Sequence, residues 1–208
     1  MTARVEHLTT SGVFSLDGQD FDVDNNVWLL GDDSEVVVVD APHSLQPILD
    51  AVAGRHVVAI VCTHAHNDHV TVAPALAKAT GAPVLLHPAD RVLWDMTHPG
   101  VQTESLADGQ QLMVAGTALT VLHTPGHAPG AVCLRAPELG VLFSGDTLFK
   151  GGPGATGRSY SDFPTILDSL RERVLTLPPQ TRVLAGHGDE TTVGAEAADY
   201  DAWVSRGH

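Results

Sequence analysis

The stretch Thr63-His64-Ala65-His66-Asn67-Asp68-His69 places three imidazoles and one carboxylate within six residues. It directly follows the apolar run Val57–Cys62 and precedes a helical pattern, which predicts a strand-to-helix turn at the edge of a sheet. In extended backbone, side chains two residues apart point the same way, so His64 and His66 can face one point. Imidazole nitrogen and carboxylate oxygen together are a ligand mixture that zinc accepts. We interpret the stretch as a metal-binding motif, because ordinary turns favour Asn, Asp and Gly over clustered His.

Three single residues further along the chain follow strand-like runs in the same manner. His127 ends the sequence TPGH, Asp146 ends the sequence SGD, and His187 ends the sequence AGH. At each place a strand is expected to end, a Gly permits a sharp turn, and a metal-capable side chain follows. A lone His after a strand is more often a solvated turn residue. Three such positions beside the first motif favour one shared metal centre.

Short β-rich runs alternate with helical stretches along the chain. The expected strands are Val27–Leu30, Val36–Asp40, Val57–Cys62, Val84–Leu86, Leu119–His123, Val132–Arg135, Val141–Ser144 and Val183–Ala185. The expected helices are Leu45–Ala53, Val70–Thr80, Pro88–Trp94, Asp162–Thr176 and a tail helix from Val193 to Trp203. This alternation predicts an α/β fold with helices on the outer faces of its sheets, and it leaves open whether there is one sheet or two. With 208 residues and no linker-like segment, the chain is expected to form one domain over residues 1–208.

The composition limits the partners that the protein can have. The formal net charge is −14, from 11 Lys and Arg against 25 Asp and Glu. Such a surface repels nucleic acid phosphates and gives no attraction to anionic membranes. No apolar run is long enough to span a bilayer, and the first residues lack the apolar segment of a signal peptide. We therefore expect a cytoplasmic protein that acts on a small molecule, with no nucleic acid and no membrane as partner.

The motifs occur in the order of a known family. THAHNDH (63–69), TPGH (124–127), SGDTLF (144–149) and GHG (186–188) resemble the motifs of the metallo-β-lactamase superfamily, and within it those of the glyoxalase II-like hydrolases. The resemblance covers about residues 26–188. It implies an αββα sandwich, in which two mixed β-sheets pack face to face and are flanked by helices. Since the sequence continues only a short way beyond the last motif, we expect it to lack the C-terminal helical domain of full-length glyoxalase II.

The resemblance also implies a centre of two divalent metal ions, with Zn²⁺ as the expected metal and iron as the alternative. The implied ligands are, for the first metal, His64, His66 and His127, for the second metal, Asp68, His69 and His187, and, bridging the two, Asp146. A water shared by two divalent ions loses its proton near neutral pH, which gives a metal-bridging hydroxide as nucleophile. The ions would polarise the substrate carbonyl and stabilise the oxyanion that forms. Asp68 and Asp146 are the expected catalytic carboxylates, with Asp68 orienting the hydroxide.

The glyoxalase II-like motifs imply a thioester substrate, such as a hydroxyacyl-thiol. The loop after the third motif carries Lys150, Arg158 and Tyr160, which are the expected substrate-binding residues. Arg158 is suited to pair with a substrate carboxylate. The loop departs from the Gly-Cys-Gly-Arg form common in these enzymes, so the thiol carrier stays open. Asp40 resembles an acidic position behind the family's metal site, where it would orient the histidine turn.

Three other functions are compatible with these residues. His64, His127 and Asp146 would also make the two-histidine, one-carboxylate triad of an iron enzyme. Persulfide dioxygenases of the same superfamily share the HxHxDH pattern, so a mononuclear iron persulfide dioxygenase is one alternative. Lactone hydrolases of the same fold share all seven ligands. A metal-stabilised binding domain without activity is the third alternative, and the coordination positions left open at each metal argue against it.

Overall fold

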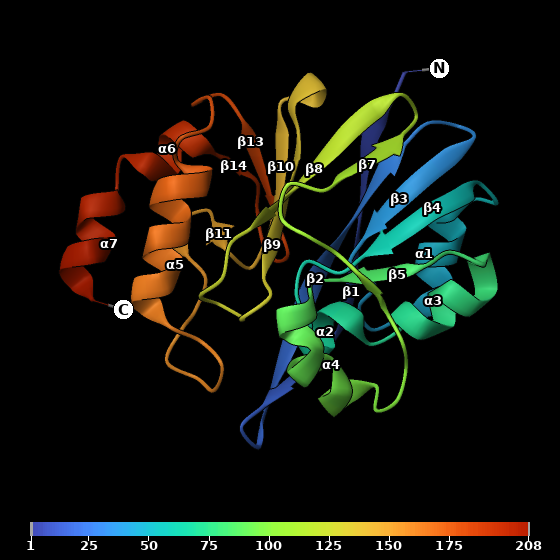
Figure 1. Ribbon diagram of the computed structural model, residues 1–208, viewed down its shortest axis with the longest axis horizontal. Coiled ribbons are helices and arrows are strands. Elements are labelled where there is room, and N and C mark those ends of the chain that lie inside the picture. The colour runs from blue at the N-terminus through green and yellow to red at the C-terminus, as the bar shows by residue number, and fades with distance from the viewer. Residues whose placement is uncertain (1, 208) are drawn as a thin grey trace.

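In the computed structural model, which describes residues 2–207, two β-sheets pack face to face and helices cover both outer faces (Figure 1). Met1 and His208, the end residues of the expected domain, lie outside the described residues. Each of the two large sheets contains parallel and antiparallel strand pairs. The α/β sandwich of two mixed sheets flanked by helices is therefore confirmed.

The first sheet has six strands in sequential order, from β1 to β6. They are β1 (Arg4–Leu16), β2 (Gln19–Gly31), β3 (Glu35–Val39), β4 (His56–Val61), β5 (Val84–Leu86) and β6 (Glu104–Ser105). The pairs β1–β2 and β2–β3 are antiparallel, whereas β3, β4, β5 and β6 run parallel to one another. Parallel strands need crossover connections, and helices provide them on the outer face.

The second sheet has the strand order β14-β13-β10-β9-β8-β7. Its strands are β7 (Gln111–Val114), β8 (Thr117–His123), β9 (Val132–Ala136), β10 (Val141–Gly145), β13 (Arg182–Ala185) and β14 (Thr191–Thr192). Among the described strands of this sheet, only the neighbouring strands β10 and β13 are parallel. A small two-stranded sheet of β11 (Leu148–Phe149) and β12 (Gly152–Pro153) lies beyond the end of β10.

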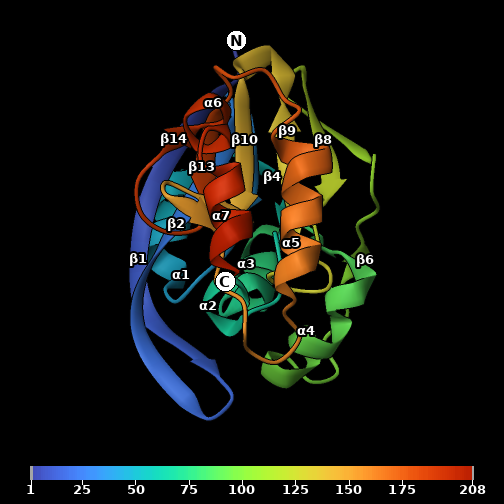
Figure 2. The ribbon, with the colours of Figure 1, turned by 90° about the vertical axis from the view of Figure 1, so that its left-hand side faces the viewer.

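The helices form the two outer layers of the sandwich. The layer on the first sheet contains α1 (Leu45–Val52), α2 (Asn67–Val70), α3 (Ala73–Thr80), the short η1 (Pro88–Asp90) and α4 (Arg91–Thr97). The second layer contains α5 (Phe163–Ser169), its π-helical continuation η3 (Leu170–Val174), α6 (Val193–Ala197) and α7 (Tyr200–Arg206). Figure 2 shows α5 and α7 side by side over the second sheet. A short η2 (Pro137–Leu139) joins β9 to β10. Within residues 2–207, none of the helices combines the length and the apolar character that crossing a membrane requires.

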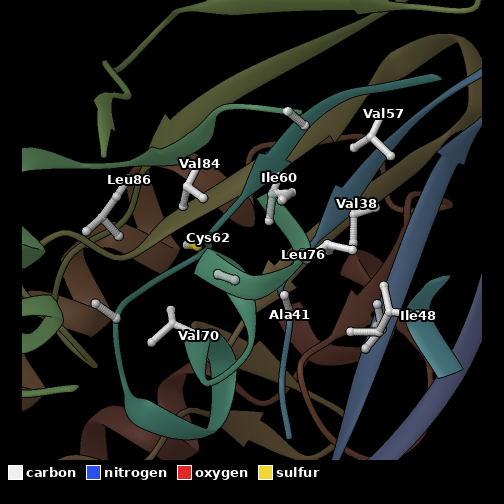
Figure 3. Packing of buried hydrophobic residues seen from close by; sticks show 14 of the residues in the cluster. Val38, Ala41, Ile48, Val57, Ile60, Cys62, Val70, Leu76, Val84 and Leu86 are labelled. Carbon is white, nitrogen blue, oxygen red and sulfur yellow. The ribbon is translucent and has the colours of Figure 1, made fainter. Parts of the chain in front are cut away.

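The valine run of β3 explains how the layers are held together. Val36 and Val38 belong to the cluster between the first sheet and its helices. Figure 3 shows Val38 in this cluster with Ile48 of α1. Val37 and Val39 point the other way, into the core between the two sheets. A strand that is buried on both faces reads as a continuous apolar run, because successive side chains alternate between the faces. A third cluster fills the space between the second sheet and α5 and α7.

Neither β1 nor the outer half of β2 was predicted from the sequence. The expected strand Val27–Leu30 is the inner end of β2, which is 13 residues long and pairs with all of β1. Asp17 and Gly18 connect the two strands, and both have positive φ, as a tight two-residue hairpin turn requires. The outer part of this hairpin is solvated on both faces, so it lacks the apolar alternation that reveals a strand. The Asp17-Gly18 pair is the feature of the sequence that indicates a hairpin turn here.

Two expected helices are interrupted. The expected tail helix from Val193 to Trp203 is two helices, α6 and α7, separated at Ala198 and Asp199. The expected helix Val70–Thr80 is two helices, α2 and α3, because Thr71 and Val72 separate them. Pro74 lies in the first turn of α3, where its missing N–H has no helical partner to lose. The start expected at Asp162 is confirmed, since its side chain accepts a hydrogen bond from Thr165 N at 2.9 Å.

The core between the sheets should carry much of the stability. Leu134 of β9 is completely buried there. We expect Leu134→Ala to lower the free energy of unfolding by about 2–5 kcal/mol, because it leaves a cavity between two sheets that cannot collapse. Urea denaturation followed by tryptophan fluorescence measures the change. Met113→Ala, at an exposed position, is the control and should change stability by less than about 0.5 kcal/mol. Equal losses in the two variants would contradict this packing.

Candidate metal centre

The motif at residues 63–69 lies where the first sheet meets its helices. Strand β4 ends at Val61, and the chain passes through the motif directly into α2. The strand-to-helix turn expected from the sequence is confirmed. His64, Asp68 and His69 are nevertheless buried, and His69 has no exposed surface at all. Loops normally lie at the surface, so buried polar side chains in this turn require an explanation.

The later candidate residues arrive from strand ends of the second sheet. His127 lies in the loop after β8, Asp146 follows β10, and His187 follows β13. Strands β10 and β13 are parallel, so Asp146 and His187 emerge at the same edge. The seven predicted ligands meet there. Within each of three groups the ligand atoms lie within 4.8 Å of one another: His64, His66 and His127; His64, His69 and Asp146; Asp68, His69 and His187.

The first cluster consists of three histidines from two different sheets. His66 Nδ1 lies 3.0 Å from His64 Nε2 and 3.0 Å from His127 Nε2. The rings are nearly perpendicular to one another, so their nitrogens, rather than their faces, converge. His127 Nδ1, on the far side of its ring, faces the backbone oxygen of Ala155 at 2.8 Å. A contact of this kind orients an imidazole and fixes which nitrogen is free to bind a metal.

The second cluster lies beside the first and shares Asp146 with it. His187 Nε2 lies 3.3 Å from His69 Nε2 and 3.3 Å from Asp68 Oδ2. Asp146 Oδ1 lies 3.3 Å from His69 Nε2, and its Oδ2 lies 3.5 Å from both His127 Nε2 and His187 Nε2. The Asp146 carboxylate thus contacts one histidine of the first cluster and two of the second.

Three polar atoms at this centre have no hydrogen-bond partner among the described residues. They are His66 Nε2, Asp68 Oδ1 and Asp146 Oδ1, and all three are buried. Leaving a buried polar atom unpaired costs about 1–3 kcal/mol, and more for a charged group, so such atoms mark a missing partner. Nitrogen and carboxylate oxygen donors suit divalent zinc or iron. The residues therefore fit a metal centre.

The first cluster is electrostatically prepared to accept metal. Burial lowers the pKa of His66 to about 3 and also lowers the pKa values of His64 and His127. These imidazoles are therefore neutral at physiological pH, and each has a lone pair on one ring nitrogen. Metals bind the deprotonated form of a ligand, so no proton has to leave this cluster first.

The second cluster has the opposite protonation. Burial alone would lower the pKa of His187, but the charges of Asp146 and Asp68 raise it to about 10. Burial alone would raise the pKa of Asp146, but His69 and His187 hold it well below its usual range. Protons on the two histidines therefore balance the buried carboxylates, and a divalent cation would replace those protons on binding.

Asp40 supports the motif from behind. Its Oδ2 lies 2.8 Å from His69 Nδ1, and its two oxygens accept hydrogen bonds from the backbone N and the hydroxyl of Thr63 at 2.7 and 2.8 Å. Asp40 is buried and has a φ of +63°, a strained backbone conformation for a residue with a side chain. These contacts fix the ring of His69 and are those expected of a residue that orients a ligand.

Sequence reasoning missed Asn25, which supports the second cluster. Its Nδ2 donates to Asp68 Oδ2 at 3.1 Å, and its Oδ1 lies 2.8 Å from His43 Nε2. Asn25 is completely buried although it lies in a polar stretch of β2. No spacing in the sequence connects position 25 with position 68, so only the hairpin that brings β2 to the motif reveals this contact.

The hairpin also forms one wall of a cavity over the metal centre. Asn67 of the motif holds it, donating to the Val13 oxygen at 2.7 Å and accepting from Ser15 N at 2.7 Å. The ring of Phe14 then lies 5.2 Å from that of His66. The cavity has a volume of about 200 Å³. Besides five of the metal-centre residues it is lined by Phe14, Val23, Phe149 and Ala155. Its walls are apolar around a polar floor, as in most small-molecule sites.

Two of the three predicted substrate-binding residues, Arg158 and Tyr160, lie in the loop whose residues contact the tip of the hairpin, whereas Lys150 lies in the turn between β11 and β12. Arg158 lies beside the cavity, where its guanidinium stacks over the Phe21 ring at 4.8 Å and donates to Gln19 Oε1 at 3.1 Å. Lys150 forms an ion pair with Asp189 at 2.9 Å in an exposed position. Tyr160 is exposed and has a φ of +69°. Both cations thus already contact side chains of the protein, so a substrate carboxylate would have to compete for them.

Comparison with known proteins agrees with this geometry. A family model described as the metallo-beta-lactamase superfamily matches residues 21–187. An uncharacterised protein of Aquifex aeolicus is 34% identical, over 79% of this chain and 83% of that protein. A hydroxyacylglutathione hydrolase of Rhodobacter capsulatus is 37% identical, over 79% of this chain and 62% of that protein, so the chain spans less than two thirds of this relative.

A similar solved structure is that of a protein crystallised in a di-iron-bound form. It has a TM-score of 0.77 and 35% sequence identity, and the match covers 84% of this chain and 93% of that one. The family match includes all seven predicted ligands, and the TM-score indicates the same fold. The chain belongs to the metallo-beta-lactamase superfamily.

Proposed function

We propose that this metal-dependent hydrolase of the metallo-beta-lactamase superfamily cleaves thioesters at a centre of two metal ions. The observation that carries the proposal is the pair of three-residue ligand clusters that share one carboxylate, Asp146. A structural zinc site is closed by four protein ligands, whereas a catalytic site keeps a position for water or substrate. Two clusters of three ligands around a shared carboxylate, at the floor of a cavity, agree with the catalytic arrangement.

His64, His66 and His127 would hold one ion, Asp68, His69 and His187 the other, and Asp146 would contact both. Bound there, two divalent ions would activate a water and polarise the substrate carbonyl. Asp68 keeps Oδ2 on Asn25 and His187 while its Oδ1 has no partner among the described residues. With one oxygen of Asp68 on the metal, its other oxygen would accept a hydrogen bond from the attacking water and orient it toward the carbonyl carbon.

The thioester preference is supported by the cavity and by one relative. The hydroxyacylglutathione hydrolase of Rhodobacter capsulatus acts, by its name, on a thioester of a hydroxy acid. A cavity of about 200 Å³ with Phe14 and Phe149 in its walls accommodates a short acyl group and the thioester sulfur. The rest of the thiol would lie along the rim between the hairpin and the loop of Arg158. Arg158 would contact a carboxylate of the thiol there, at the expense of its contact with Gln19.

We propose zinc as the native metal, with iron as the alternative. Neutral imidazoles and carboxylates bind either metal, so the ligand set does not separate them. The similar structure in a di-iron-bound form supports the two-metal count and keeps iron under consideration.

Replacing the shared carboxylate tests the two-metal centre. We expect Asp146→Ala to lower the metal content from about two ions per chain to one or fewer, because Asp146 lies within 3.5 Å of nitrogens from both clusters. Plasma mass spectrometry on protein purified without chelator or histidine tag gives the count. Asp95→Ala removes an exposed carboxylate paired with Arg91 and should keep the wild-type metal content. An unaltered count in Asp146→Ala would contradict the shared ligand.

Thioester hydrolysis is tested with a hydroxyacyl thioester by following the released thiol. We expect His66→Ala to lower kcat/KM at least about a hundredfold, since even changes behind metal ligands cost about 10–100-fold. Chelation should abolish the activity, and added zinc should restore it. Lactones belong in the same panel, because lactone hydrolases share the ligands. Oxygen uptake with glutathione persulfide, one iron per chain and no hydrolysis would instead identify a persulfide dioxygenase.

The apolar wall should act on binding more than on chemistry. We expect Phe14→Ala to raise KM for the thioester about tenfold, which corresponds to about 1.4 kcal/mol of lost contact, and to leave kcat within about threefold. Val13→Ala is the matched control, because the neighbouring side chain on the strand points to the opposite face. Steady-state kinetics of both variants make the comparison. Equal effects at the two positions would argue against Phe14 as a wall of the substrate site.

A further inference from the structure

Asp90 is a fully buried carboxylate that belongs to neither ligand cluster. It is the last residue of η1, before α4, and none of its surface is exposed. Within residues 2–207 it forms no ion pair with Lys or Arg. Buried carboxylates without a cationic partner are rare, because the charge loses its hydration. Its position therefore requires an explanation.

The two oxygens of Asp90 accept hydrogen bonds from two different loops. Ala65 N donates to Oδ2 at 2.8 Å, and Gly130 N donates to Oδ1. Ala65 lies between His64 and His66 in the first motif. Gly130 lies in the loop that follows His127 and leads into β9. One carboxylate therefore connects the backbones of the two loops that supply all three histidines of the first cluster.

The backbone of Gly130 lies so close to Asp90 that a side chain at position 130 has no room. A Cβ atom on Gly130 would lie 2.7 Å from Asp90 N and 2.9 Å from Asp90 Cβ and Cγ. Real Cβ atoms do not come so near to backbone or to a fixed carboxylate, so any side chain at position 130 would push the loop away. Lack of space, rather than backbone conformation, makes glycine necessary here.

The arrangement does not serve stability alone. Burial raises the pKa of Asp90 to about 6, against the effect of the two N–H groups. The folded protein therefore holds the ionised form less well than water does, so the free energy of unfolding falls as pH rises from the unfolded pKa of 3.8 to about 6 and stays lowered above it. The loops are also joined without Asp90, since Val132 N donates to Thr63 O at 2.8 Å. Residues that cost stability in the fold are often retained for function.

We propose that Asp90 is a positioning residue for the metal bound by His64, His66 and His127, and that it acts by fixing the distance between their two loops. The inference rests on the proposed metal centre. It concerns the first cluster only, because the second is oriented by other residues: His69 through Asp40, and Asp68 through Asn25. Loss of Asp90 should therefore weaken one metal position and leave the other unchanged.

The test is a Co²⁺ titration of metal-free protein, followed by visible absorption in competition with a chromophoric chelator. In wild-type protein we expect two equivalents to bind. Asp90→Asn keeps the size of the side chain but puts an NH₂ against one of the two N–H donors. We expect it to weaken one equivalent about 10–100-fold, with an altered absorption band, while the second equivalent keeps its affinity and spectrum. Gly130→Ala should weaken the same equivalent, because it displaces the same loop.

Asp32→Asn is the matched control. Asp32 also accepts hydrogen bonds from two backbone N–H groups, those of Ser34 and Glu35, but it lies in the turn between β2 and β3, away from the centre. It should leave both equivalents unchanged. Circular dichroism of the metal-free variants separates metal positioning from a damaged fold.

Two results would overturn the proposal: wild-type affinity for both equivalents in Asp90→Asn, or equal weakening of both together with a changed metal-free spectrum. If wild-type protein binds only one equivalent, the two-metal centre of the proposed function fails instead. The affinity of that single equivalent in Asp90→Asn then decides the role of Asp90, since a loss of about tenfold or more supports it and no loss overturns it.

Discussion

Face-to-face packing of the two sheets is the constraint on which the metal centre depends. The motif of residues 63–69 belongs to the first sheet, whereas His127, Asp146 and His187 belong to the second. Each cluster takes ligands from both sheets. The core between the sheets, with Val37 and Leu134 in it, therefore fixes distances between groups that no single turn could hold. Close packing resists small displacements, which is why a ligand set spread over two sheets can be rigid.

Four buried carboxylates surround this centre, two facing the candidate metal position and two behind the turns that carry the predicted ligands. Asp146 and Asp68 face the point where metal would bind, and their charge is balanced by protonated His69 and His187. Asp40 and Asp90 lie behind, and each accepts two backbone or side-chain hydrogen bonds from ligand-bearing turns. So many negative groups in one region are costly without cations. The same cost would favour the binding of divalent ions at this candidate site, and bound metal would then stabilise the fold.

The β1–β2 hairpin joins the metal centre to the substrate cavity. Its inner end delivers Asn25 to Asp68, and its outer end places Phe14 beside His66. Asn67, at a position of the motif that binds no metal, holds the hairpin by pairing with its backbone. The loop that carries Arg158 contacts the tip of the hairpin through Gln19 and Asp17. In Figure 1 the blue tip of the hairpin and the orange loop lie near each other at the bottom. In the proposed function, substrate selection and metal binding would therefore share one structural support.

The sequence by itself determined the α/β class, most inner strands and all seven metal-capable residues, because ligand chemistry and strand-end glycines are local properties of the chain. Residues 64–69 form one continuous motif, which can be interpreted as metal-binding without knowledge of any distant residue. Apart from Asp40, which the family resemblance had indicated, only the tertiary structure decided which residues support those ligands. The contacts of Asn25, Asp90 and Phe14 join positions far apart in sequence, and their spacing carries no periodic signal. The contact between Arg158 and Phe21 likewise depends on the tertiary structure, because the fold determines which side chain of the hairpin lies next to this surface cation.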